Sequence, residues 1–193
     1  MKTYFSLLIA LLGLASAINF FTISTYAPEH PRLDSKIINA NGRAFVIGAT
    51  SPSTQCGIQD QKHCPRGVAT LVNADMSVLA VAVPGGQVIY VAPDGSISYS
   101  VAHSALRPPG SQVGGFYTSQ VLPGSHPPVL IISWRSKAGP SGLWACPVSP
   151  LVPITSRAVL KASTQTFTGQ GCLPVAGLRI QPAGSAVGAW EYT

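Results

Sequence analysis

Short runs of apolar and β-branched residues alternate with Gly- and Pro-rich turns along most of the chain. The clearest example is residues 78–103, which we interpret as three short strands joined by two turns. A Pro-Gly-Gly sequence at 84–86 ends the first run, because proline fixes φ and glycine accepts the positive φ of a type II turn. Pro-Asp-Gly at 93–95 separates two further runs and predicts a hairpin. Residues 97–101 alternate with the period of a half-buried strand.

The same pattern predicts further strands on both sides of this region. The pair Asn41-Gly42 lies between two apolar runs and is a strong hairpin signal. Residues 49–67 and 103–115 are polar stretches without periodicity, and we expect them, like the turn at 122–128, to be loops. Further strands are expected at residues 19–26, 37–38, 44–47, 68–72, 116–121, 129–134, 143–147, 156–162, 173–180 and 186–192.

Taken together, these runs predict an all-β protein with about twelve short strands and no amphipathic helix. Such a chain must hide its strand edges in a sandwich, a barrel or a β-trefoil. About twelve strands divided among three units suit a β-trefoil with long loops. We therefore favour a β-trefoil-like fold, with a β-sandwich as the alternative, although no three-fold repeat is visible in the sequence.

The N-terminus has the features of a secretory signal peptide. Lys2 supplies a positive charge, residues 7–14 are apolar, and Ala15-Ser16-Ala17 is a small-residue cleavage site. We expect residues 1–17 to be removed and residues 18–193 to form a single domain. The apolar stretch is too short to cross a bilayer, and no later stretch is long enough, so we expect no transmembrane segment.

All four cysteines follow the predicted signal peptide. An even number in a secreted chain indicates two disulfides, for which three pairings are possible. We expect Cys56–Cys64 and Cys146–Cys172, because each pair flanks loop-like sequence. A metal site at Cys56, His63 and Cys64 is the alternative, but adjacent His and Cys do not have the usual ligand spacing. We therefore expect no metal.

Charge is sparse and positive, with a formal net charge of +6. The low charge and high apolar content argue against disorder. The basic residues are scattered and form no cluster with interleaved aromatics, which argues against a nucleic-acid partner.

Candidate catalytic residues are few. Asp94, His103 and Ser104 lie in one region and could form a hydrolase triad, but no Gly-x-Ser-x-Gly elbow is present. Asp94 is more simply a turn residue, and His103 and Ser104 more simply bond loop backbone. The six acidic residues lie mostly in turns or loops and suggest no glycosidase pair. We therefore expect a protein that is not an enzyme and needs no cofactor.

Aromatic side chains are candidates for binding carbohydrate, although most alternate as core residues would. We name Trp134, Tyr90, Tyr99 and His103 as ligand-binding candidates. Trp134 is the aromatic that we expect to be exposed, because a polar turn follows it.

Several segments together resemble a known family. The resemblance runs through the mature chain and is strongest from Pro84-Gly-Gly-Gln through Asp94-Gly to Ala102-His-Ser, and in the two Cys-Pro pairs. These segments are similar to the small secreted fungal proteins called IgE-binding proteins, and more distantly to the fungal cell-wall protein PhiA. Other matching segments are Phe45-Val-Ile-Gly48, Trp144-Ala-Cys-Pro147 and Ala189-Trp-Glu-Tyr-Thr193.

The resemblance implies an extracellular or wall-associated fungal protein, with members linked to wall development, antibody binding and elicitor activity. It brings no catalytic residues. Our leading hypothesis is a non-enzymatic, allergen-like secreted protein whose partner is cell-wall polysaccharide or a host protein. The alternatives are a secreted effector that binds a host defence protein, and a small hydrolase that uses His103. The oligomeric state is not predicted.

Overall fold

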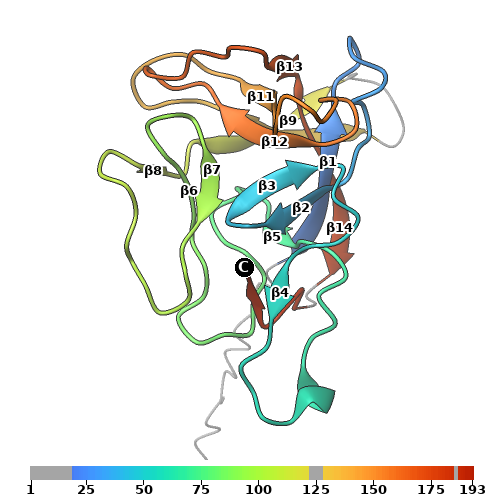
Figure 1. Cartoon of the computed structure of the whole chain (residues 1–193), viewed down its shortest axis with the longest axis vertical. Helices are drawn as coiled ribbons and strands as arrows, with labels where there is room; N and C mark the ends of the chain where they lie inside the picture. The colour runs from blue at the N-terminus through green and yellow to red at the C-terminus, as the bar shows by residue number, and fades with distance from the viewer. Residues whose placement is uncertain (1–18, 122–127, 185–186) are drawn as a thin grey trace, which may run out of the picture.

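The computed structural model describes residues 19–121, 128–184 and 187–193, and almost all of its regular structure is β-strand (Figure 1). The predicted signal peptide and most of the predicted turn at 122–128 lie outside these ranges. The described residues form one short 3-10 helix, η1 (Gln61–His63), and fifteen strands. The strands are β1 (Phe20–Tyr26), β2 (Ile38–Asn41), β3 (Ala44–Ile47), β4 (Thr54–Gln55), β5 (Val72–Asn73), β6 (Ile89–Val91), β7 (Ile97–Tyr99), β8 (Gln112–Val113), β9 (Phe116–Val121), β10 (Val129–Trp134), β11 (Leu143–Pro147), β12 (Ala158–Ala162), β13 (Leu173–Val175), β14 (Gly177–Gly184) and β15 (Glu191–Tyr192).

The strands pair into two five-stranded sheets and two smaller ones. The first sheet has the order β5-β1-β14-β10-β9, and the second has the order β13-β11-β12-β3-β2. Strands β7, β6 and β8 form a third sheet, and β15 pairs with β4 beside the C-terminus (Figure 1). The pairs of strands are antiparallel. The all-β class is confirmed, while the choice of a β-trefoil over a β-sandwich stays a prediction.

Both predicted hairpins form. Strands β2 and β3 are joined through Gly42 and Arg43, which have φ values of 60° and 61°. Two successive positive φ values define a type I′ turn, whose twist matches that of paired strands. Strands β6 and β7 are joined through the Pro-Asp-Gly turn. Gly95 has φ 82°, and a Cβ at this position would lie 2.4 Å from the carbonyl oxygen of Ala162, so only glycine fits.

One apolar core joins the two five-stranded sheets and the β6–β7 hairpin. It includes Ile23 of β1 and Phe45 of β3. Tyr99 of β7 packs edge-on against Phe45, with ring centroids 5.8 Å apart. Trp134, at the end of β10, packs against Phe116 of β9 at 4.9 Å. Because apolar burial is the main favourable term in folding, the same core stabilises the hairpin and both large sheets.

The first run of the predicted meander, residues 78–83, is not a strand, and that prediction was wrong. These residues make isolated bridges only. The amide of Ala80 donates to Leu71 and that of Ala82 donates to Ala189. Ala80 and Ala82 therefore hydrogen-bond to segments that lie far apart in the sequence. Residues 78–83 form no continuous ladder with a single partner strand.

Four strands, β4, β5, β8 and β15, have two residues each. The number exceeds the expected twelve because β4 and β8 were not expected and the expected strand at 173–180 is divided into β13 and β14. A two-residue strand has no alternation to detect, because the signal needs several residues. The predicted strand at 68–72 therefore shrinks to β5, and β4 and β8 lie in stretches that were expected to be loops.

Buried hydrogen bonds hold the C-terminal strand β15. The amide side chain of Gln87 accepts the N–H of Tyr192 at 2.8 Å and donates to its carbonyl at 2.9 Å. The hydroxyl of Tyr192 accepts the N–H of Leu71 at 3.1 Å and donates to the carbonyl of Ala69 at 2.9 Å. Burial raises the pKa of Tyr192 to about 12, and it raises the pKa of Tyr99 to about 12 as well.

Candidate functional site

The cysteines form the two predicted disulfides, Cys56–Cys64 and Cys146–Cys172. The second bond joins β11 to the residue that precedes β13. It therefore fixes the far end of the loop that connects β12 to β13. The near end is fixed by backbone hydrogen bonds from Ala162 to Gly95 and from Ser163 to Gly142.

Three adjoining hollows surround this loop. Their volumes are about 330, 240 and 420 Å³, and we number them in that order. The first and second hollows share Thr164, and the first and third share Thr166. The second and third share residues 167–169. The three hollows therefore adjoin one another around the loop, and we call them together the loop site.

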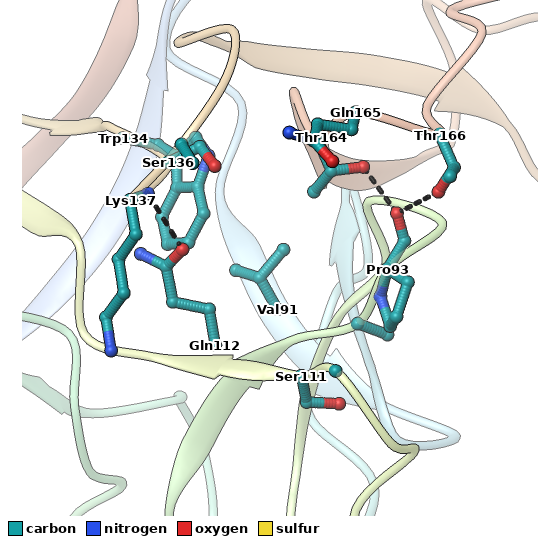
Figure 2. Close-up of a pocket in the computed structure, with 13 residues that line it drawn as sticks. Val91, Pro93, Ser111, Gln112, Trp134, Ser136, Lys137, Thr164, Gln165 and Thr166 are labelled. Carbon is teal, nitrogen blue, oxygen red and sulfur yellow. Dashed lines mark hydrogen bonds between the residues drawn. The ribbon is translucent and has the colours of Figure 1, made fainter.

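The first hollow lies between the loop and the β6–β7 and β10 regions (Figure 2). Val91 and Trp134 close its base, and Ser136 and Lys137 lie on the side opposite the loop. Gln112 is anchored there, because its side-chain oxygen accepts the backbone N–H of Lys137 at 3.0 Å. The polar rim around an apolar base is typical of a ligand site in which a few groups fix orientation.

Hydrogen bonds to the β6–β7 turn set the shape of the loop. The hydroxyls of Thr164 and Thr166 both donate to the carbonyl oxygen of Pro93, as Figure 2 shows. These two hydroxyl protons are therefore engaged inside the protein. The side chains of Ser136 and Gln165 also line the first hollow, and neither forms a hydrogen bond with another described residue. Their polar atoms are therefore available to bind a ligand.

An aromatic pair lines the second hollow. The rings of Trp144 and Phe167 have centroids 5.8 Å apart and an angle of 52° between their planes, and both side chains are partly exposed. The indole N–H of Trp144 donates to the hydroxyl of Ser163 at 2.8 Å, which fixes the ring. Partly exposed rings beside hydroxyl groups suit a ligand with both C–H and O–H surfaces.

The third hollow contains the carboxylate of the loop site. Asp94 pairs with Lys161 at 3.3 Å. Partial burial raises the pKa of Asp94, but hydrogen bonds from Ser96 and the charge of Lys161 outweigh that effect, so the pKa is lowered overall. The carboxylate is therefore charged at neutral pH and serves as an ion-pair partner and turn residue.

The candidate triad does not converge. Asp94 bonds Ser96 and Lys161, and the hydroxyl of Ser104 accepts the backbone N–H of Leu106 at 3.2 Å. No hydrogen bond joins His103 to either of them among the described residues. Five hollows that the described residues form are lined by no histidine, and none of the five is lined by two acidic side chains.

The predicted exposure of Trp134 is wrong, since its side chain is 1% exposed. The residue follows the inward-facing Ile132 at the strand period of two, and its indole N–H donates to Ser163 at 2.9 Å. Tyr90 and Tyr99 are also buried, at 4% and 1% exposure. Burial leaves these three rings no free face to present to a ligand, although Trp134 closes the base of the first hollow.

His103 is exposed and has a positive φ of 58°. It lies against the turn at Gly85 rather than at the loop site. The sequence places Trp144 among the aromatic candidates for carbohydrate binding without singling it out, and it gives no signal for Phe167. In the run of residues 143–147, Leu143 and Ala145 are buried, so the alternation of the strand turns Trp144 outward, and that period was readable from the sequence.

The fold and the site define a disulfide-containing, all-β protein with polar and aromatic surface hollows. An "uncharacterized secreted protein" of Arthroderma benhamiae is 34% identical to this chain over 167 residues, which cover 86% of this chain and 82% of the relative. The chain belongs to the same family of secreted fungal proteins. No family model matches the chain, and no solved structure matches it. Within the described residues, none of the helical structure has the length and apolar character needed to span a membrane.

Proposed function

We propose that this protein is a non-enzymatic, wall-associated fungal protein that binds polysaccharide at the loop site. The supporting observation is the partly exposed Trp144–Phe167 pair beside hollows lined by hydroxyl and amide groups. Sugars have apolar C–H faces, which pack on aromatic rings, and hydroxyl groups, which pair with amides and hydroxyls. Three adjoining hollows lie around the loop, so the site suits several linked sugars rather than one.

The non-enzymatic part of the proposal rests on the distribution of acid and base groups. Glycoside hydrolysis uses two carboxyl groups that face the same bond, and Asp94 is the one carboxylate among the described lining residues of the loop site. A histidine base is missing from the same lining, and the lowered pKa of Asp94 does not suit a general acid at neutral pH.

Sedimentation with insoluble polysaccharide tests the proposal. The purified mature protein is mixed with chitin, β-glucan or mannan, and the bound fraction is measured for the wild type, Trp144→Ala and Phe167→Ala. Tyr117→Ala is the matched control, because this aromatic is 40% exposed on β9, outside the linings of the loop site. We expect the two loop-site variants to lose up to about tenfold in affinity for the polymer that binds, since an aromatic contact contributes ~0.5–1.5 kcal/mol. We expect the control to bind normally.

A wild type that sediments with none of the polymers would contradict the proposal, as would equal losses in all three variants. Near-ultraviolet circular dichroism of each variant confirms that the tertiary packing is intact. The antibody-binding role implied by the resemblance to IgE-binding proteins is a separate proposal, tested by immunoblotting with sera from patients sensitised to fungi.

A further inference from the structure

The positive charge of the chain has an uneven distribution. Six basic residues and no acidic residue lie between Gly95 and Trp190, whereas the rest of the chain contains six of each. The formal net charge of +6 therefore arises in this one segment. The segment supplies most of the loop site, including the aromatic pair and the loop itself.

Two of these six basic residues have carboxylate partners. Lys161 pairs with Asp94 at 3.3 Å, and Arg179 pairs with Asp34 at 3.0 Å. Among the described residues, no carboxylate lies within ion-pair distance of the other four, which are Arg107, Arg135, Lys137 and Arg157.

Lys137 is the unpaired cation that lines the loop site. Its backbone N–H is held by Gln112, while its exposed side chain lies along the first hollow in Figure 2. No acidic residue is among the described residues that line this hollow. Arg135 is two residues away, with its guanidinium carbon 5.2 Å from the centre of the Tyr117 ring, and it adds positive potential nearby. Like charges gathered without counter-charges attract an anionic ligand and raise its local concentration.

We propose that the loop site selects a glycan that carries negative charge, as the carboxylate of a uronic acid or as a phosphate ester. The ammonium group of Lys137 pairs with the anion, and the free polar atoms of Ser136 and Gln165 bind neighbouring hydroxyls. The Trp144–Phe167 pair packs on an adjoining uncharged sugar. This inference rests on the proposed function and adds the chemical class of the ligand.

The test compares four soluble polymers: polygalacturonate, phosphomannan, unsubstituted mannan and polyglutamate. Binding is measured by calorimetry with the intact mature protein at two salt concentrations. Lys137→Gln is compared with Lys62→Gln, a matched control on the exposed Cys56–Cys64 loop. We expect polygalacturonate or phosphomannan to bind more tightly than mannan and more weakly as salt rises. We expect Lys137→Gln to weaken that binding about tenfold and Lys62→Gln to leave it unchanged.

Each other outcome has a definite meaning. Salt-insensitive binding of mannan and the acidic glycans with equal affinity would overturn the inference and leave the proposed function intact. Equal affinity of Lys137→Gln and the wild type would also overturn the inference. Polyglutamate binding as tightly as any glycan would overturn the inference and the proposed function together. No binding to any of the four polymers would overturn the inference, while sedimentation with chitin and β-glucan tests the proposed function separately. Preference between polygalacturonate and phosphomannan identifies the source of the anion.

Discussion

Removing one buried hydroxyl, by Tyr192→Phe, should measurably destabilise the protein. The side chain is 1% exposed, and its hydroxyl accepts from Leu71 at 3.1 Å and donates to Ala69 at 2.9 Å. Phenylalanine keeps the ring and therefore leaves no large cavity. The variant isolates the hydroxyl that ties β15 to the segment before β5.

The expected magnitude follows from the groups that lose their partner. The N–H of Leu71 is part of a buried hydrogen bond, and a buried donor without a partner costs ~1–3 kcal/mol. Ala69 is partly exposed, so its carbonyl can bond water instead and the lost hydrogen bond adds little. We expect the free energy of unfolding to fall by about 2 kcal/mol, a large share of the ~5–15 kcal/mol typical of a domain.

Urea denaturation followed by tryptophan fluorescence measures this change. Tyr117→Phe is the matched control, because Tyr117 is 40% exposed and no hydrogen bond to its hydroxyl occurs among the described residues. We expect the control to change stability by less than about 0.5 kcal/mol. Equal stabilities of the two variants, at unchanged slopes of the denaturation curve, would refute the argument that this hydroxyl anchors the C-terminal strand.

Three further perturbations test other parts of the structure. Burial raises the pKa values of Tyr99 and Tyr192 to about 12 from the ordinary value of 10.0. The two protonated tyrosines therefore contribute stability below pH 10, and this contribution is lost as pH rises from 10 to 12. Chemical denaturation across that range should show the free energy of unfolding decline. Replacing both Cys146 and Cys172 by Ala should lower the free energy of unfolding by about 3–4 kcal/mol, and replacing Cys56 and Cys64 should lower it by ~2–3 kcal/mol, because the first pair closes a longer loop. Equal losses in urea denaturation would contradict this reasoning. Gly95→Ala should lower the free energy of unfolding by more than about 2 kcal/mol. Gly86→Ala should lower it by about 1 kcal/mol, because nothing lies within 4 Å of the added Cβ. If thermal unfolding ranked the two variants in the reverse order, the steric argument would be excluded.

Local sequence signals predicted the long strands and the turns well. The expected strands at 116–121, 129–134 and 143–147 coincide with β9, β10 and β11. The hairpins at Asn41-Gly42 and at 93–95 form, because turn residues with positive φ act through the local backbone alone. The disulfide pairing was also readable, since each pair closes a local loop.

Features that depend on distant segments were not readable in the same way. The apolar run at 78–83 has the composition of a strand, but its hydrogen-bond partners are scattered through the chain. The loop site likewise brings together Pro93, Gln112, Ser136 and Thr164 from separate parts of the sequence. No single stretch of the sequence contains enough of the site to reveal it. The polar turn after Trp134 suggested that this side chain is exposed, but the period of the strand turns it into the core.

Hydrogen–deuterium exchange with and without bound polysaccharide tests the central claim most directly, because it localises the ligand on the protein. The wild type is saturated with the wall polymer that retains it, and amide exchange is compared along the chain. Our account predicts slower exchange at residues 136–144 and 163–169, with no change in the Cys56–Cys64 loop. Protection elsewhere, with none around the 163–169 loop, would contradict the assignment of the binding site.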